Sequence, residues 1–185
     1  MANASPSVPA MNRTRCAPAE GAVELFTPAC VEYLVRLHDQ FTSRIHELRA
    51  KRADVLRKAL VEGVFPSSPP KSRINTEAWQ VPPVPEDLQK PGIEISGPCS
   101  ITGMFINALN PGPEGERAEG DLDDDEDSGG HRLVDTVKAA HNRLAAVHRE
   151  LAYLDPEKGK AYRIAEGELP FFMHRERGLH LDEPD

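Results

Sequence analysis

The stretch Gly92-Ile-Glu-Ile-Ser-Gly-Pro98 decides the fold class, because it has the pattern of a short strand that ends in a Gly-Pro turn. A short apolar helix is predicted at 104–109, an acidic segment at 111–127 and an amphipathic helix at 133–151. Residues 169–174 form a mostly apolar run, which is typical of a buried strand. Strand, helix, acidic segment, helix and strand in this order predict an α/β fold with a parallel sheet.

Upstream of this pattern, the sequence predicts two helices and a connector. Thr27-Pro28 is typical of a helix start, and a second helix is expected to begin near Thr42 and to end at Gly63. We expect these two helices to form a small hairpin. Proline is frequent in residues 65–92 and forbids regular helix or central strand there, so Trp79 is expected to dock on a neighbouring surface.

Composition and charge exclude several classes of function. The chain has 185 residues, a formal net charge of -8 and no long basic run, so it is a poor nucleic-acid binder. It has no run of about 18 apolar residues, which predicts no membrane span. Its first ten residues lack the pattern of a secretory signal, and three widely spaced cysteines suit a reducing compartment. We therefore expect a cytoplasmic protein.

The acidic run Asp121-Leu-Asp-Asp-Asp-Glu-Asp127 is the first candidate for chemistry. Six carboxylates in seven residues repel one another unless water or a cation neutralises them. No register of the run fits an EF-hand, because the required Glu at the twelfth position is missing. From the residues alone, a solvated acidic loop is favoured over a metal site.

The second candidate is the group Arg175, Arg177 and His180 beyond the last predicted strand. Ligand groups gather at the carboxyl ends of strands in α/β proteins, and an arginine there can bind a carboxylate by two hydrogen bonds. The alternative is a surface arginine that pairs with Glu176 or Asp182. For Cys99 a buried or partly buried thiol is favoured over a nucleophile, since no adjacent base can be located.

Taken together, these segments resemble the N-terminal part of the malate synthases. The resemblance rests on four short motifs in the same order: Ile93-Glu-Ile-Ser-Gly-Pro98, Ile106-Asn-Ala-Leu-Asn110, Asp124-Asp-Glu-Asp-Ser128 and Arg175-Glu-Arg-Gly-Leu-His-Leu-Asp-Glu183. The Thr27-Pro28 helix with its neighbour, and the segment Trp79 to Leu88, are similar to the helical clasp and the lead-in to the barrel in that family. The family has Pro where this chain has Glu176 and Trp where it has Leu179.

The resemblance implies a fold and a division of the chain. It implies an α/β fold with a helical clasp followed by an incomplete (β/α)₈ TIM barrel of three strands, because 185 residues are too few for the roughly 200–250 of a closed barrel. Residues 1–23 are then a disordered tail, 24–91 the clasp and proline-rich connector, and 92–185 the start of the barrel. Residues 113–121 are polar where the family has an apolar strand, and burying their carboxylates is costly, so we expect no buried second strand of that kind.

The resemblance also implies a reaction. Malate synthases condense acetyl-CoA with glyoxylate and water to malate and CoA, with a Mg²⁺ that holds glyoxylate. By position, Arg177 would contact glyoxylate and stabilise the enolate oxyanion. Asp124, Glu126 and Asp127 would lie near the metal and act through its waters, which reverses the preference for a solvated loop. The direct metal ligands and the catalytic base would lie beyond residue 185, so the chain alone is expected to be inactive.

Two other functions stay open from the sequence. One is a non-enzymatic remnant that binds a partner, because three strands leave an open sheet edge that a partner or further chain must cover. The other is a related CoA-ester lyase. The helical clasp and the Asn-Ala-Leu-Asn110 motif favour the synthase over the lyase.

Overall fold

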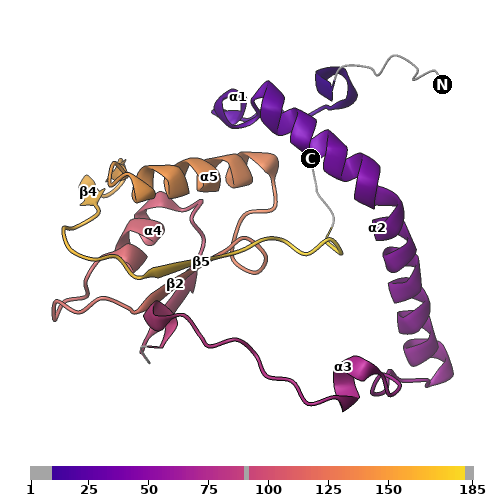
Figure 1. Ribbon diagram of the computed structural model, residues 1–185. Coiled ribbons are helices and arrows are strands. Elements are labelled where there is room, and N and C mark those ends of the chain that lie inside the picture. Colours follow the sequence, from indigo (N-terminus) through magenta and orange to yellow (C-terminus); the bar gives the residue numbers. More distant parts are fainter. Residues whose placement is uncertain (1–9, 90–91, 182–185) are drawn as a thin grey trace, which may run out of the picture.

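The computed structural model describes residues 10–89 and 92–181, and it contains an N-terminal helical part and an α/β part (Figure 1). The helical part is dominated by α2 (Pro28–Glu62). Thr27 caps the helix by accepting a hydrogen bond from the Cys30 N–H at 3.3 Å, and Gly63 ends it with a left-handed φ of 68°. The predicted start and end are confirmed, but the predicted hairpin is wrong. Between Pro28 and Gly63 the chain has no glycine or proline that would turn it, and the helix runs through Thr42.

Short elements flank the long helix. Of the expected tail at 1–23, residues 1–9 lie outside the described part, and η1 (Ala10–Arg13) packs on α2 through an ion pair between Arg13 and Asp39. The four-residue helix α1 (Ala22–Leu25) contacts the α/β part through α5.

The connector after Gly63 carries two short elements and much exposed surface. These are α3 (Arg73–Thr76) and η2 (Glu86–Leu88). Trp79 is 66% exposed, so the expectation that it docks on a neighbouring surface is wrong for this chain. Its indole N–H donates to the Ile74 carbonyl at 2.8 Å, which fixes the ring locally instead.

The α/β part contains a three-stranded parallel sheet in the order β1-β2-β5. The strands are β1 (Glu94–Gly97), β2 (Gly120–Asp124) and β5 (Phe171–Arg175). The predicted α/β class is therefore confirmed, whereas the TIM barrel and the clasp stay predictions. β5 alternates half-buried and exposed residues, so it is not the fully buried strand that its apolar run predicts.

The central strand contradicts the sequence expectation most clearly. β2 overlaps the start of the acidic run. Four aspartates are buried here: Asp121, Asp123 and Asp124 in the strand and Asp125 directly after it. The solvated loop that the residues alone favour is wrong for these buried aspartates. The polar segment 113–119 forms no strand, as expected, and the second strand lies at 120–124 instead. The strand forms because both neighbours supply a backbone ladder, and because cationic side chains from other elements bond to several of these carboxylates.

Two helices cover one face of this sheet (Figure 1). They are α4 (Thr102–Leu109) and α5 (Leu133–Val147), each following a strand as predicted, although α5 ends four residues before the expected Leu151. The core between helices and sheet is small and apolar, formed by Cys99, Phe105, Ile106, Leu109, Ala139, Ala146 and Leu151. Phe105 of α4 and Phe172 of β5 meet with ring centroids 5.8 Å apart, so Phe172 marks the helix-covered face.

The chain forms a second sheet from the segment that follows α5 and precedes β5. It is an antiparallel hairpin of β3 (Ala152–Asp155) and β4 (Lys160–Arg163). Gly159 turns the hairpin with a left-handed φ of 60°. No helix in the described ranges is long and apolar enough to cross a membrane.

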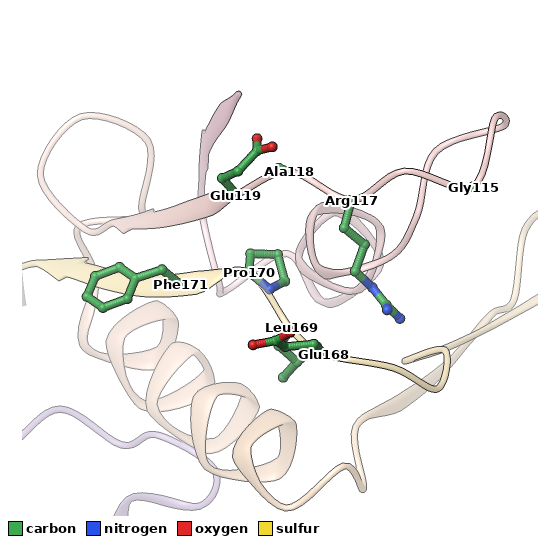
Figure 2. A pocket seen from close by; sticks show the side chains of 8 residues that line it. All are labelled: Gly115, Arg117, Ala118, Glu119, Glu168, Leu169, Pro170 and Phe171. Atoms are coloured by element: carbon green, nitrogen blue, oxygen red, sulfur yellow. The ribbon is translucent and has the colours of Figure 1, made fainter. Parts of the chain in front are cut away.

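A cavity of about 520 Å³ opens at the amino ends of β2 and β5 (Figure 2). Arg117 lies beside it and donates to the carbonyls of Leu109, Ala165 and Glu166. Its guanidinium thus fastens loops together. Because ligand groups in α/β folds gather at the opposite, carboxyl ends of the strands, this cavity is not the candidate site.

Candidate functional site

The candidate site is the edge of the sheet where the three parallel strands end. Gly97, Asp124 and Arg175 are the last residues of these strands, and the loops after them meet at this edge. The Asp125 N–H donates to the Arg175 carbonyl at 3.2 Å, which ties the acidic loop to β5. Side chains alternate along β2, so the acidic residues divide between its two faces.

On the face away from the helices, Asp124 and Arg175 form a bidentate ion pair. Arg175 Nε donates to Asp124 at 2.8 Å, and its terminal nitrogen donates to both Asp124 and Asp127. The backbone N–H groups of Glu126 and Asp127 also donate to Asp124, each at 3.1 Å. The Arg175 hydrogen bonds hold the pKa of Asp124 below its ordinary value, so this carboxylate stays charged.

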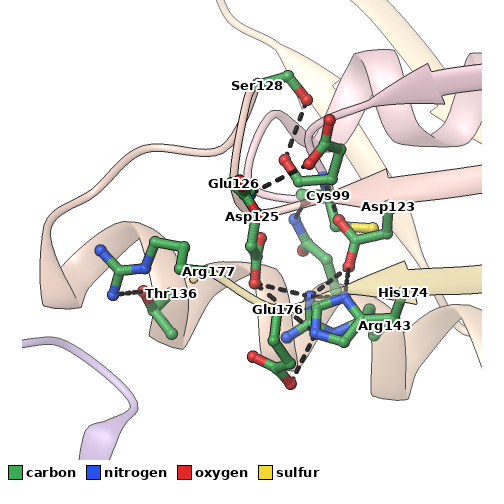
Figure 3. Close-up of polar contacts among 12 residues, drawn as sticks. Cys99, Asp123, Asp125, Glu126, Ser128, Thr136, Arg143, His174, Glu176 and Arg177 are labelled. Atoms are coloured by element: carbon green, nitrogen blue, oxygen red, sulfur yellow. Dashed lines mark hydrogen bonds and ion pairs between the residues drawn. The ribbon is translucent and has the colours of Figure 1, made fainter. Parts of the chain in front are cut away.

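On the helix-covered face, Asp123 is the centre of a second network (Figure 3). Its side chain is 0% exposed and accepts hydrogen bonds from Arg143 of α5, from His174 Nδ1 at 2.8 Å and from the Cys99 N–H at 3.1 Å. Burial alone would raise the pKa of Asp123, but the hydrogen bonds from Cys99 and Arg143 outweigh it and lower the pKa. Asp123 is therefore a buried, charged carboxylate with its donors supplied.

Asp125 and Asp121, on the same face, have fewer hydrogen bonds to offset the burial of their carboxylates. Arg143 also reaches Asp125 at 3.3 Å, yet burial and the nearby Asp123 charge raise the pKa of Asp125. Asp121 is 2% exposed, and within the described residues its Oδ2 has no hydrogen-bond partner. Burial and the Asp123 charge raise the pKa of Asp121 to about 6.

Cys99 closes this network from the end of β1. It is fully buried, and burial together with the Asp123 carboxylate raises the pKa of its thiol. The structure thus confirms that Cys99 is a buried thiol. The Asn142 amide of α5 donates to the Cys99 carbonyl at 2.7 Å and to the Thr102 hydroxyl at 3.0 Å, which fastens α5 to the start of α4.

Arg177 lies in the loop after β5 and points toward the start of α5 (Figure 3). It donates to the His131 carbonyl at 2.8 Å and contacts the Thr136 hydroxyl at 3.5 Å. The structure therefore brings Asp124 and Asp127 together through Arg175, and it places Arg177 in the adjacent loop. Glu126 is half-buried in the loop after β2.

Sequence reasoning missed Asp123, Arg143 and His174 as members of the site. Strand alternation could have placed Asp123 and Asp121 on one face, had the acidic run been assigned as strand. Nothing in the sequence indicates Arg143 or His174, because they come to Asp123 from 20 and 51 residues further along the chain.

The fold and this edge define an α/β protein with a parallel sheet whose carboxyl end carries paired acidic and basic side chains. The chain is similar to proteins named malate synthase, which confirms the resemblance that the motifs indicate. It is 32% identical to malate synthase of Streptomyces clavuligerus over 185 residues, covering 99% of this chain and 33% of that protein. It is 32% identical to that of Myxococcus xanthus and 29% identical to malate synthase A of Escherichia coli, in both cases over 86% of this chain and 28% of the relative. The chain spans about a third of the length of these curated relatives. No family model matches it.

Proposed function

We propose that the chain is the N-terminal part of a malate synthase-type acyltransferase of the glyoxylate cycle, which condenses acetyl-CoA with glyoxylate and water to malate and CoA. The similarity to proteins of that name supports the family. The observation that carries the proposal is the convergence of the acidic loop after β2 and the arginine-bearing loop after β5 at one edge of the sheet. A cytoplasmic location belongs to the same proposal.

The strand order supports an incomplete TIM barrel. β1, β2 and β5 lie side by side in chain order, all parallel, and α4 and α5 cross over between them on one face. This is the arrangement of consecutive strands in a (β/α)₈ barrel, whose functional residues gather at the carboxyl ends. The face with Asp124 and Arg175 would then face the barrel axis, and residues 24–91 would form the clasp and connector.

Two arginines compete for the role at glyoxylate. The resemblance assigns Arg177 to glyoxylate binding and to stabilisation of the developing enolate oxyanion. Arg175 is the alternative because its guanidinium lies on the axis-facing side, although Asp124 and Asp127 already share its charge. In either case a cation beside the acidic loop would bind a carboxylate substrate and offset charge that develops on it.

The residues of the acidic loop fit a Mg²⁺ held nearby. Both oxygens of Asp124 accept from Arg175, so its role is to position the loop. Glu126 and Asp127 offer carboxylate oxygens, which suit the waters of a hard cation. Bound Mg²⁺ would polarise the aldehyde of glyoxylate. The resemblance places the direct ligands and the proton-abstracting carboxylate outside these 185 residues.

A chimera tests the proposal. Residues 1–185 replace the matching third of the Streptomyces clavuligerus malate synthase, and glyoxylate-dependent release of CoA from acetyl-CoA is measured. We expect turnover from the chimera and none from the chain alone or from the relative without this third. A folded chimera without turnover would refute the synthase assignment, and cleavage of a CoA ester in its place would favour the lyase.

The same chimera separates the two arginines. Arg175→Lys and Arg177→Lys keep the charge and lose the bidentate geometry. Loss of a hundredfold or more in kcat is expected for the arginine that contacts the reacting atoms, on the order of the loss for one oxyanion donor. Near-normal turnover of both variants would remove both from the catalytic machinery.

A second candidate function is partner binding, and exposed apolar surface favours it. Phe41, Leu48 and Val55 are exposed along α2, and β1 and β5 are the outer strands of the sheet. Light scattering of the purified chain gives its oligomeric state in solution and so tests this function. A monomer that captures no partner counts against this function, whereas a stable oligomer supports it.

A further inference from the structure

Arg49 of α2 connects the helical part of the chain to the loop that follows β5. Its Nε donates to the Leu179 carbonyl at 2.9 Å, and a terminal nitrogen donates to the Leu181 carbonyl at 3.2 Å. These two acceptors lie 130 and 132 residues further along the sequence. Figure 1 shows the yellow end of the chain leaving β5 and running toward α2. The helical part therefore makes direct contact with the loop that contains Arg177.

The two acceptors of Arg49 belong to a single turn. The Leu181 N–H donates to the Gly178 carbonyl at 3.0 Å, so residues 178–181 form a hydrogen-bonded turn. The carbonyls of Leu179 and Leu181 both accept from the Arg49 guanidinium. Because arginine presents its N–H groups in a planar fork, it can hold two acceptors in one orientation. The contact thus fixes the whole turn and not a single atom.

Apolar packing contributes little to holding this turn in place. The Leu179 side chain is 68% exposed, and His180 is exposed as well. A segment with few buried apolar contacts depends on its polar contacts for a fixed conformation. The two hydrogen bonds from Arg49 therefore have a large share in placing the turn relative to the sheet.

The backbone that carries Arg177 is held on both sides. Before Arg177, the Arg175 carbonyl accepts from the Asp125 N–H at 3.2 Å, which ties the chain to the acidic loop. Directly after Arg177, Gly178 has no side chain that would restrict the backbone, and the turn bonded to Arg49 begins there. The acidic loop and the helical part thus fix the two ends of this short segment.

We propose that Arg49 is a positioning residue for Arg177, through which the helical part takes part in the site. This inference rests on the proposed function, in which Arg177 contacts glyoxylate. The bonds from Arg49 to the turn go to backbone carbonyls, so its effect reaches Arg177 through the loop. A displacement of about 1 Å in a catalytic group can cost a hundredfold in rate, so a residue that fixes the loop changes the rate without contact to substrate.

Hydrogen exchange on the 185-residue chain tests the contact itself, without substrate. Arg49→Met keeps an unbranched, helix-forming side chain and removes the donors. Exchange in residues 177–181 should become about fivefold faster or more, as expected for the loss of one or two hydrogen bonds. Arg52→Met is the control, because Arg52 is exposed one turn further along α2 and makes no hydrogen bond or ion pair with any described residue. Equal exchange in the two variants would show that Arg49 does not hold the loop.

Turnover of the chimera tests the positioning role. Arg49→Met should lower kcat/KM for glyoxylate about tenfold or more and leave KM for acetyl-CoA within about twofold. Arg52→Met should leave both values unchanged. Arg49→Lys keeps the charge but loses the planar fork, so it should recover only part of the loss.

A double-mutant cycle separates positioning from a general loss of stability. If Arg49 acts through Arg177, Arg49→Met combined with Arg177→Lys should be no slower than Arg177→Lys alone, whereas independent effects add. Additive losses, or normal turnover of Arg49→Met, would overturn the inference. A parent chimera without turnover would instead refute the proposed function and with it the role of Arg49 in turnover, while hydrogen exchange would still decide whether Arg49 holds the loop.

Discussion

The two faces of β2 carry the same kind of side chain in different surroundings. On the face away from the helices, Asp124 has a bidentate arginine and two backbone donors. On the helix-covered face, Asp123 has three donors but Asp121, two residues away, has an unpartnered oxygen among the described residues. The free-energy cost of burying a carboxylate therefore depends on the hydrogen-bond donors around it. In β2 this cost is offset for Asp123 and Asp124 but not for Asp121.

The largest effect is expected from removing the centre of the helix-covered network. Asp123→Ala removes the acceptor of the buried Cys99 N–H and leaves Arg143 with the weaker Asp125 ion pair alone, so the free energy of unfolding should fall by about 3 kcal/mol or more. Urea denaturation followed by circular dichroism measures this. A loss below about 1 kcal/mol would mean that Asp123 and Arg143 contribute little net stability.

Removing the unpartnered aspartate should have the opposite sign. The pKa of Asp121 is raised from 3.8 to about 6 in the folded state, so ionisation destabilises the fold as pH rises through this range. Asp121→Asn removes that penalty and should raise the free energy of unfolding at pH 7 by about 2 to 3 kcal/mol. The gain should shrink as pH falls below about 6 and should vanish near pH 3, where the carboxyl is protonated in both states.

Denaturation at several pH values, with a chelator present to exclude bound metal, checks this prediction. The variant should show a flatter dependence on pH between about 4 and 6 than the parent chain, since the raised pKa is lost. An Asp121→Asn chain that is less stable at pH 7 would indicate that the buried carboxylate is compensated after all.

The smallest effect is expected on the other face. Arg175→Gln removes the bidentate partner of Asp124, but the backbone donors of Glu126 and Asp127 stay in place. Stability should fall by less than in Asp123→Ala, while hydrogen exchange in the loop 124–128 should become faster. Unchanged exchange in this loop would show that the backbone turn alone holds it.

The sequence predicts where helices and strands of the α/β part lie better than it predicts which side chains come into contact. The strand at 92–98, the helix before Leu109 and the helix after Leu133 follow from spacing and turn residues. The helix break expected near Thr42 is wrong, because no glycine or proline there interrupts α2. β2 could not be predicted, because burial of Asp123 and Asp124 depends on Arg143 and Arg175, which only folding brings near. The family resemblance predicts that Asp124 and Asp127 belong to one site. That Arg175 bonds to both of them is seen only in the structure.

The exposed connector gives the protein a built-in optical reporter. Trp79 is the single tryptophan of the sequence, and it stands on the surface with its indole N–H tied to the Ile74 carbonyl. Its fluorescence therefore reports one place on the molecule without labelling. A partner protein that covers the connector would move this indole out of water and shift the emission to shorter wavelength.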